Sequence, residues 1–546
     1  MRKRWSSRSC LKRWTECKGI PLSPSPDDRL SYLSLCRFRW VFCQLEVLRH
    51  CLPASIRQTL DQLPESLDET YLRVLRQIPQ ANQAHAHRML QCLVVAIRPL
   101  RVEELAELLA FEFDAAQGRI PKYRATWQLD DKTQAVLSTC SSLVSIVNDG
   151  WYGCQVQFSH FSVKEFLMSN RLGGFSRYHI RPESAHTTLT QACLGSLLHL
   201  DGHVVAASVY GFPLAEYAAR HWVEHAQFED VVSHVKEGVE ILFDSEKPHF
   251  AAWIGIHDID TPTVYEPEFS ASEILRSTTP NPLYYSVLCG FYDLVKHLAI
   301  KHPQLVNAIC GQYGYPLPAA LSEDYVEVAE LLLEHGASVH VRGRTGKTIL
   351  LNVLSHSQRD LASVVKLLLK HGADVNARDN ALKSSLHLLA QYKGDLEVAQ
   401  ILLKHNADVH CQDDNGKTPL HTLLEGPVRY KADVLEHVRL LLEHGADVNI
   451  RDKDGQTPLY LAVREDLFGV AGILLEHGAN ADAENYNEGT ALQLLSKTRF
   501  EERHVLNLAL ALLKHGADAN RRVKDDKTPL HLAIRLGRPQ LARIFS

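Results

Sequence analysis

The sequence predicts a mainly α-helical protein, in which a helical bundle containing one β-hairpin is followed by an α-solenoid of short repeats. The repeats are visible in residues 279–546, where Leu-Leu-x-His-Gly-Ala or a close variant recurs. The histidine position of this pattern falls at His335, His371, His405, His444, His477 and His515. Recurrence at a nearly fixed interval indicates a stack of similar units. Upstream of the repeats, apolar residues recur at helical spacing except in one short stretch that alternates.

The composition excludes several classes of protein. The chain has 546 residues, of which 59 are basic and 64 acidic, so its net charge of -5 selects neither nucleic acid nor an anionic membrane. Its 12 cysteines form no Cys-x-x-Cys pair, which is typical of a reduced intracellular protein. The longest apolar runs are far shorter than the roughly 20 residues that span a bilayer. We therefore expect no membrane span and a cytoplasmic location, with the nucleus as the alternative.

The chain begins with a basic segment. Residues 1–37 are rich in arginine and serine and lack the apolar core of a secretory signal, so we interpret them as a disordered tail. A mitochondrial transit segment is the less favoured alternative. Residues 38–98 are predicted to be helical, because Leu67, Tyr71 and Leu75 share one helical face.

One later stretch predicts a β-hairpin. Residues 143–147 and 154–158 alternate apolar and polar side chains, and Asn148-Asp149-Gly150 between them supplies turn residues. A helix follows, for which Ser162 is the expected N-cap and Glu165 the capping-box partner. Helices followed by a two-stranded wing describe a winged helix, which we place at 99–175.

The next two segments are predicted from periodicity. Residues 176–245 contain further helical patterns and form a helical domain, in which Tyr217 and Trp222 are expected to pack in the core. Periodicity then fades over 246–278, which we interpret as a linker before the repeats.

Four stretches of this first part resemble a known family. They read Phe-Arg-Trp-Val-Phe-Cys-Gln-Leu at 38–45, Leu-Pro-Glu-Ser-Leu-Asp-Glu-Thr-Tyr at 63–71, Arg-Pro-Leu-Arg-Val-Glu-Glu-Leu at 98–105 and Phe-Ser-His-Phe-Ser-Val-Lys-Glu-Phe-Leu at 158–167. In this order they are similar to the C-terminal part of fungal NACHT-ankyrin proteins, which are signal-transduction ATPases of the NOD-like receptor type. The resemblance implies that 38–98 is the helical remnant that follows a NACHT core.

The nucleotide-binding core of that family is missing from the sequence. A phosphate-binding loop reads Gly-x-x-x-x-Gly-Lys-Ser/Thr, and its glycines let backbone N–H groups cradle phosphate. Gly-Lys-Thr occurs at 346–348 and 416–418, but Val341 and Cys411 stand where the first glycine is needed. We therefore expect neither ATPase activity nor another enzymatic activity, and no cofactor.

The resemblance does imply a role for one histidine. In related receptors the histidine of a Phe-x-His-x-Ser motif reaches the phosphate of a bound nucleotide, and His160 matches that position. Since no phosphate-binding loop accompanies it, local hydrogen bonds at the hairpin-to-helix junction are the preferred interpretation. His160 is a cofactor-binding candidate only if a complete assembly binds nucleotide.

Each repeat begins with a motif related to Thr-Pro-Leu-His. Its first position falls at Asn281, Tyr315, Thr348, Ser384, Thr418, Thr457, Thr490 and Thr528, which are 33 to 39 residues apart. Over 279–546 the sequence therefore resembles ankyrin repeats, whose unit is about 33 residues. We predict seven complete repeats and a truncated eighth. Together with the missing core, the truncation predicts an incomplete gene product or a degenerate paralogue.

The signature residues have mechanical roles. The first position can cap the first helix, and prolines such as Pro419 suit the first helical position, where no N–H is needed. Glycines such as Gly336 end the second helix in the left-handed conformation, and Asn406 takes that place once. Histidines such as His421 are expected to hydrogen-bond a neighbouring turn, so we predict no metal site.

These features favour a non-catalytic scaffold or sensor in signal transduction. Ankyrin repeats bind a protein partner through their finger loops and concave face. The candidate partner-binding residues are Arg342, Arg344, Asn415, Lys453 and Tyr486 in the fingers and Tyr430 in an inserted loop. An exposed aromatic tip such as Tyr486 is the favoured anchor.

The alternative function is DNA binding by the winged helix. A recognition helix needs basic residues. The helix after the wing carries Glu165 beside Lys164, and earlier helices carry Glu103, Glu104 and Glu107. We interpret these acids as evidence against phosphate binding and expect no nucleic-acid partner.

Overall fold

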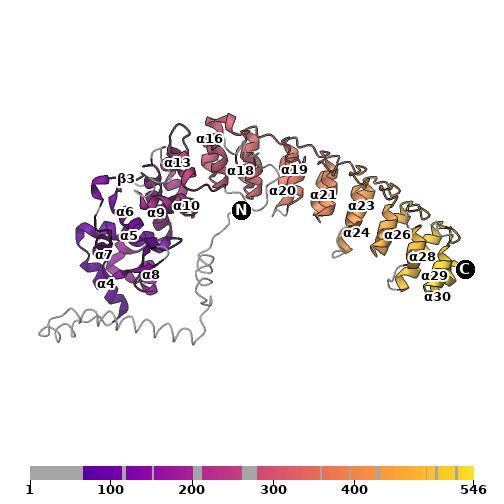
Figure 1. Ribbon diagram of the computed structural model, residues 1–546, viewed down its shortest axis with the longest axis horizontal. Coiled ribbons are helices and arrows are strands. Elements are labelled where there is room, and N and C mark those ends of the chain that lie inside the picture. The colour runs from indigo at the N-terminus through magenta and orange to yellow at the C-terminus, as the bar shows by residue number, and fades with distance from the viewer. Residues whose placement is uncertain are drawn as a thin grey trace. The chain divides into compact units, whose positions relative to one another are not determined.

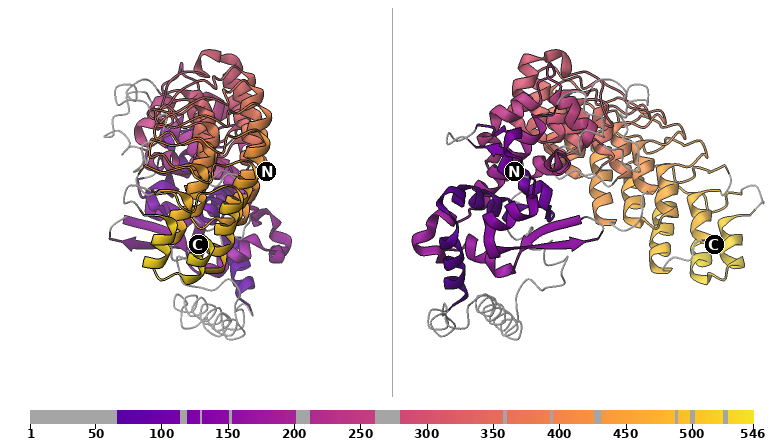
Figure 2. Two further views of the ribbon diagram at one scale, coloured as in Figure 1. Left: turned by 90° about the vertical axis from the view of Figure 1, so that its right-hand side faces the viewer. Right: turned by 60° about the vertical axis from the view of Figure 1, so that its left-hand side comes forward.

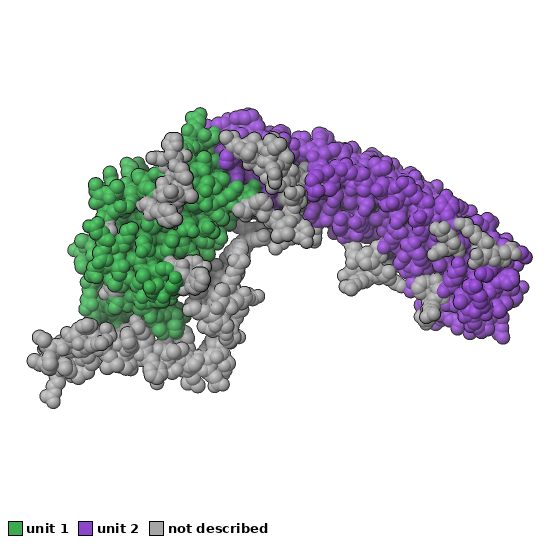
Figure 3. All heavy atoms as spheres, viewed as in Figure 1, with its two compact units in different colours: residues 1–261, 289–294 green, residues 262–288, 295–546 purple. Residues whose placement is uncertain are grey.

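The computed structural model describes residues 66–546 apart from 114–118, 129, 151–152, 201–211, 261–279, 357–359, 393–394, 426–430, 487–488, 498–501 and 523–526. The expected tail at 1–37 and the start of the segment 38–98 therefore lie outside the described residues. The chain divides into two compact units (Figure 3). Unit 1 comprises residues 1–261 and 289–294, and unit 2 comprises residues 262–288 and 295–546.

Unit 1 is mainly helical and contains two small β-sheets (Figure 1). Its α-helices are α4 (Leu67–Gln77), α5 (Gln83–Val95), α6 (Val102–Glu107), α7 (Lys132–Cys140), α8 (Phe161–Met168), α9 (Pro182–Leu197), α10 (Pro213–Ala226), α11 (Val231–His234), α12 (Lys236–Leu242) and α13 (His249–Ile256). Its strands are β1 (Leu100–Arg101), β2 (Phe111–Glu112), β3 (Lys122–Tyr123), β4 (Val144–Asp149) and β5 (Gly153–Phe158).

The winged helix is formed by α5, β1, α6, α7, β4 and β5 in chain order. The predicted hairpin is confirmed: β4 and β5 pair antiparallel, with Ile146 opposite Val156. β1 pairs with the other edge of β5, which gives the sheet order β1-β5-β4. In this order the recognition position belongs to α7, the helix directly before the wing. Our assignment of that position to the helix after the wing was therefore wrong.

The helix after the wing also begins differently from the prediction. α8 begins at Phe161, and its N-cap is His160, whose side chain accepts a hydrogen bond from the backbone N–H of Ser162. Ser162 is thus the second helical residue and not the cap. It is buried, and its hydroxyl is 2.8 Å from the phenolic oxygen of Tyr71 in α4.

The core of unit 1 extends into the segment that we expected to be a linker. Tyr217 and Trp222 are fully buried, as predicted. Helix α13 lies within 246–278, and its Trp253 is buried and donates a hydrogen bond of 3.0 Å to the carbonyl oxygen of Ala219. Because Phe250 and Trp253 supply an apolar face, the first part of the expected linker packs as a helix.

From Pro282 onward, helices follow one another in pairs that stand side by side (Figures 1 and 2). The pairs are α15 (Pro282–Leu288) with α16 (Tyr292–Lys301), α17 (Pro316–Ser322) with α18 (Val326–Glu334), α19 (Ile349–Leu354) with α20 (Leu361–Lys370), α21 (Ser385–Gln391) with α22 (Leu396–Lys404), α23 (Pro419–Glu425) with α24 (Lys431–Glu443), α25 (Pro458–Arg464) with α26 (Phe468–Glu476), α27 (Ala491–Lys497) with α28 (Glu502–Lys514) and α29 (Pro529–Arg535) with α30 (Pro539–Phe545).

The predicted repeat register is confirmed. All eight predicted first positions directly precede the first helix of a pair. The hydroxyls of Thr348, Thr457 and Thr528 accept hydrogen bonds from backbone N–H groups of the helices that they cap. After the second helix the backbone turns left-handed, with a φ of 85° at Gly336 and 63° at Asn406. The leucines between these points are buried, so caps, stops and apolar faces all follow the repeat.

Two further observations concern the described residues as a whole. None of their helices is both long and apolar enough to cross a membrane. Neither do they contain a group of three or more His, Cys, Asp or Glu side chains able to hold a metal ion.

Candidate partner-binding surface

The repeats that begin with α19, α21, α23 and α25 each present a short loop, or finger, ahead of the first helix. We consider four of them, 342–347, 378–383, 412–417 and 451–456. Three fingers are closed by an aspartate that accepts hydrogen bonds from two backbone N–H groups. In the third, Asp413 Oδ1 accepts from Asn415 at 2.9 Å and from Lys417 at 2.8 Å. Asp379 and Asp452 repeat these two bonds in their own fingers.

Side chains link each finger to the next by a repeating set of bonds, which we call the finger ladder. In each rung one side chain donates to the backbone carbonyl oxygen of its counterpart one repeat later. The rungs are Arg342 to Arg378 at 2.7 Å, Arg378 to Gln412 at 3.0 Å, Gln412 to Arg451 at 3.4 Å and Arg451 to Glu484 at 3.0 Å. The four rungs of the finger ladder therefore join five successive fingers.

The fingertips are also joined through the backbone. The N–H of Asn380 donates to Thr345 O at 2.9 Å, and equivalent bonds run from Asp414 to Ala381, from Lys453 to Asn415 and from Tyr486 to Asp454. Fingertip backbone groups that would otherwise face water are thus paired between neighbours. The finger edge is held in one conformation before any partner binds, which reduces the entropy lost on binding.

His421 bonds a neighbouring turn, as predicted. His421 Nδ1 lies 2.8 Å from Thr418 Oγ1, and its Nε2 lies 3.1 Å from the carbonyl oxygen of Gln456 in the next repeat. His387 makes the equivalent bonds one repeat earlier. Burial lowers the pKa of both imidazoles, so they are neutral in the folded protein near pH 7.

The structure places the predicted arginines in different roles. Arg342 donates to the carbonyl oxygens of Gly346 and Arg378, both at 2.7 Å, so it belongs to the finger ladder. Arg344 is exposed at the tip of the same finger, and its guanidinium takes no part in the finger ladder. Both arginines are exposed, but only the guanidinium of Arg344 is not engaged in the finger ladder.

The other predicted residues lie further along the edge. Asn415 and Lys453 are exposed on adjacent fingertips. Tyr486 is 55% exposed, and its ring covers Gly455, where an added Cβ would lie 3.0 Å from ring atoms. Tyr486 is therefore an exposed aromatic side chain on a fixed support. Tyr430, like the inserted loop around it, lies outside the described residues.

A groove of about 650 Å³ opens between these fingers. Leu382 lines it together with three cations and four acids, namely Arg378, Arg451 and Lys453 and Asp408, Asp413, Asp414 and Asp452. Leu382 is 44% exposed, with a φ of 59°, and sequence reasoning missed it. Three other fingers have glycine at the matching position. The leucine in place of that glycine was the signal in the sequence.

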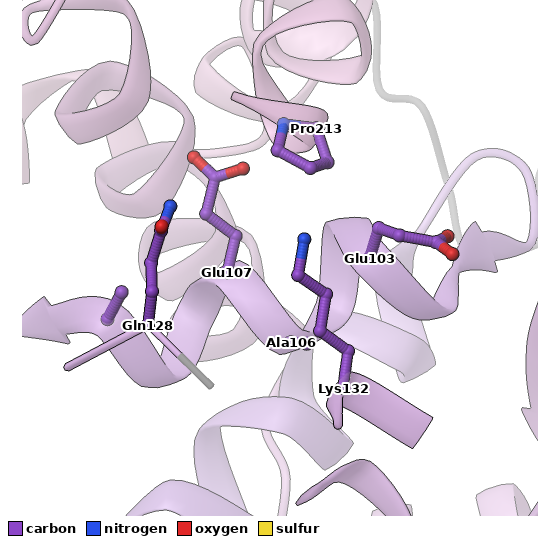
Figure 4. Close-up of a pocket in the computed structure, with 7 residues that line it drawn as sticks. Glu103, Ala106, Glu107, Gln128, Lys132 and Pro213 are labelled. Atoms are coloured by element: carbon purple, nitrogen blue, oxygen red, sulfur yellow. The ribbon is translucent and has the colours of Figure 1, made fainter. Parts of the chain in front are cut away.

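Unit 1 contains a much smaller cavity, between α6 and the start of α10. It has a volume of about 10 Å³, which is room for one water molecule. Glu107 lines it, with Lys132 and Glu103 nearby (Figure 4). Burial raises the pKa of Glu107 to about 7, although hydrogen bonds from Leu214 N–H and Ser196 oppose this. The site is too small for a substrate.

The acids of α6 do not form the repelling surface that the sequence suggested. Glu104 is fully buried and forms ion pairs with Arg98 at 2.6 Å and Arg101 at 2.8 Å. Glu107 is also buried, and only Glu103 is exposed. Our use of all three as exposed acids against DNA binding was therefore wrong.

The imidazole of His160 is engaged within unit 1. Its Nδ1 is 2.6 Å from the hydroxyl of Ser162, which in turn is 2.8 Å from Tyr71 OH. The side chain thus joins the end of the hairpin to α8 and, through Ser162, to α4. These are local hydrogen bonds of the kind that we preferred for this residue.

Two models of known protein families match the chain, each over a different part. The family model described as "Ankyrin repeats (3 copies)" matches residues 283–379 and 386–485. The model described as "GPI inositol-deacylase, winged helix domain" matches residues 75–179, and so begins ahead of the range 99–175. The chain therefore contains ankyrin repeats and a winged-helix domain.

Relatives with curated descriptions match parts of the chain. "Azaphilone pigments biosynthesis cluster protein L" of Monascus ruber is 30% identical over 295 residues, which are 51% of this chain and 61% of that protein. The mouse "CAP-Gly domain-containing linker protein 3" is 30% identical over 147 residues, or 23% of this chain and 27% of its own. "Alpha-latrocrustotoxin-Lt1a" of Latrodectus tredecimguttatus is 37% identical over 62 residues, 11% of this chain and 4% of the toxin.

Proposed function

We propose that this protein is a non-catalytic interaction scaffold or sensor, whose ankyrin fingers bind a protein partner in a signalling pathway. The observation that carries the proposal is the finger ladder together with the bonds between fingertips. They fix a continuous edge of exposed side chains across several repeats, and rigid presentation favours protein recognition.

We further propose that the chain derives from a NACHT-type signalling protein without its ATPase core. The stretches at 63–71, 98–105 and 158–167 support this origin, because they follow the order found in that family. Both Gly-Lys-Thr sequences lie in finger loops ahead of a first helix, and each lacks the first glycine of a phosphate-binding loop. Hydrolysis of ATP or tight binding of ADP by the purified chain would contradict this proposal.

DNA binding is less well supported. Within the described residues, helix α7 carries one basic side chain, Lys132, and this side chain lines the cavity beside Glu107. Its exposed residues Thr133, Gln134 and Ser138 are uncharged. A recognition helix without available cations lacks the main source of affinity for phosphates. Salt-dependent retention of the protein on duplex DNA would overturn this preference.

The test of the proposal compares two exposed tyrosines. Tyr486 lies on a finger and is 55% exposed, whereas Tyr392 follows α21, away from the fingers, and is 50% exposed. Proximity labelling with the full chain identifies its partners, and the labelling is repeated with Tyr486→Ala and Tyr392→Ala. We expect Tyr486→Ala alone to reduce labelling of a partner. Equal labelling by both variants and the parent chain would count against the finger edge.

A further inference from the structure

The fingers differ in charge along the edge. The fingers 342–347 and 378–383, which we call the basic finger pair, contain five cations, Arg342, Arg344, Lys347, Arg378 and Lys383, and one acid, Asp379. Five positive charges minus one negative charge give a net charge of +4. The next finger, 412–417, has one cation and two acids, and 451–456 has two of each. Positive charge is therefore concentrated at one end of the edge.

Within the described residues, the cations of the basic finger pair form no ion pair with a carboxylate. Arg342 and Arg378 donate to backbone carbonyl oxygens, and Lys383 donates to the amide oxygen of Gln391 at 2.7 Å. The hydrogen bond from the backbone N–H of His410 lowers the pKa of the nearby Asp408, and the positive charge of Arg378 makes a smaller contribution in the same direction. Arg344 is exposed and Lys347 is half-buried, and among the residues that the structure describes neither side chain forms an ion pair with a carboxylate, so Arg344 in particular is available to an anionic partner.

Leu382, at the edge of this pair, has a conformation that does not suit leucine. Its φ of 59° is left-handed, and the matching positions are Gly346, Gly416 and Gly455, with φ between 72° and 78°. Among the described residues with positive φ, it is the one apolar residue other than glycine. A side chain with a Cβ is strained in this region, and strained residues cluster at functional sites.

The strain at Leu382 places an apolar side chain where a partner can reach it. The side chain is 44% exposed and lines the groove of about 650 Å³ beside the basic finger pair. Packing would explain the strain of a fully buried leucine, but Leu382 leaves 44% of its surface exposed to solvent. The exposed leucine and the groove adjoin the cationic finger 342–347, because the N–H of Asn380 in the finger of Leu382 donates to Thr345 O, and this juxtaposition indicates the kind of segment that fits.

We propose that the basic finger pair and Leu382 bind an extended, acidic segment of a protein partner, with an apolar side chain of that segment seated on Leu382. This inference rests on the proposed function. A nucleic acid fits less well, because Asp408 and Asp414 line the same groove and repel a continuous phosphate backbone. A protein segment can carry its acids at one end only.

The test uses the full chain and peptides selected with it from a phage-displayed random library. We expect selected peptides to combine acidic residues with an apolar residue. A fluorescein-labelled selected peptide should bind Leu382→Gly and the double variant Arg344→Glu, Lys347→Glu about tenfold more weakly. For the double variant the loss should shrink as salt is raised.

Two control variants separate the site from general effects. Lys370→Glu with Lys404→Glu makes the same charge change at exposed positions at the ends of α20 and α22, and should leave binding unchanged. Asn406→Gly changes another left-handed residue away from the fingers and should also bind normally. Leu382→Gly should raise the melting temperature by roughly 2–4 °C, since glycine adopts this conformation without strain.

Several outcomes would overturn the inference. Selected peptides without acids, or equal binding by the parent, Leu382→Gly and the charge variant, would exclude this site while leaving other finger contacts open. Binding of mixed-sequence duplex DNA or phosphatidylserine vesicles that depends on Arg344 and Lys347, with no selected peptide, would assign the cations to another ligand. A Leu382→Gly variant that is no more stable would remove the argument from strain. The tyrosine comparison tests the proposed function independently.

Discussion

The carboxylate of Glu107 in α6 accepts a hydrogen bond of 2.8 Å from the backbone N–H of Leu214, the second residue of α10. This bond joins the winged helix to the helical domain that follows it. Burial raises the pKa of Glu107 from 4.5 to about 7, so the folded protein binds this proton more tightly than the unfolded chain. The resulting stabilisation is complete below about pH 4.5 and is lost as the pH rises through about 7.

Glu107→Gln should therefore stabilise the protein at alkaline pH. The amide oxygen can still accept from Leu214, but it carries no charge to bury. We expect the free energy of unfolding to increase by about 1–3 kcal/mol near pH 8 and to change little near pH 5. Denaturant unfolding at both pH values measures this. Glu103→Gln, an exposed position on the same helix, should show no such difference. If the free energy of unfolding of Glu107→Gln depended on pH as that of the parent does, Glu107 would not be the group responsible for this dependence.

The capping histidines predict the opposite pH dependence for the repeats. Burial holds the pKa of His421 below its ordinary 6.5, so its stabilisation is present above pH 6.5 and is lost as the pH falls. The chain contains a natural replacement: Gln493 accepts from Thr490 N–H at 3.0 Å and donates to Lys527 O at 3.2 Å in the next repeat.

His421→Gln should therefore keep the bonds and reduce the acid sensitivity. Thermal unfolding at about pH 7.5 and about pH 5 checks this, because the drop in melting temperature between them should be smaller than in the parent. His387→Gln should act in the same direction. If both variants lost as much stability in acid as the parent, titration of these imidazoles would not be the cause of the acid sensitivity of the repeats.

Gly346 is predicted to tolerate no side chain. Its φ is 78°, and an added Cβ would overlap Asn380 Oδ1 and lie 3.0 Å from Asn380 N. Gly346→Ala should lower the free energy of unfolding by about 1–3 kcal/mol. Gly472, inside α26, has nothing within 4 Å of such a Cβ. Gly472→Ala should therefore raise stability by about 0.5–1 kcal/mol, and equal effects at both positions would contradict the packing described.

Arg342 and Arg344 are two residues apart, yet they should behave differently. Arg342→Ala removes two bonds to backbone carbonyl oxygens and should cost about 1–2 kcal/mol of stability. Arg344→Ala should stay within about 0.5 kcal/mol of the parent, because this exposed side chain takes no part in the finger ladder. Chemical denaturation of the two variants measures the difference. Similar losses would show that the finger ladder contributes little.

The repeat register could be predicted because it depends on local chemistry. Caps such as Thr457, first-turn prolines and left-handed glycines act within a few residues, and each falls where the sequence indicated. The recognition position of the winged helix could not be read in the same way. It depends on β1, a strand of two residues whose pairing with β5 is visible only in the folded sheet.

The candidate site was predicted only in part, for a related reason. Arg342 and Arg344 have the same residue type, and nothing local tells which one bonds to a neighbouring repeat. Leu382 looks ordinary in the sequence because its strain follows from the finger fold. Glu104 and Glu107 look exposed because their partners come from residues 98, 101, 196 and 214.

In every rung of the finger ladder the acceptor is a main-chain oxygen, and every amino acid has one. A fingertip side chain can therefore be exchanged by mutation without taking away the group on which the preceding repeat depends. The donor positions are constrained to long side chains such as arginine or glutamine, whereas the tips between them can diverge. Such an arrangement allows mutations to change which partner the protein recognises while its scaffold stays the same.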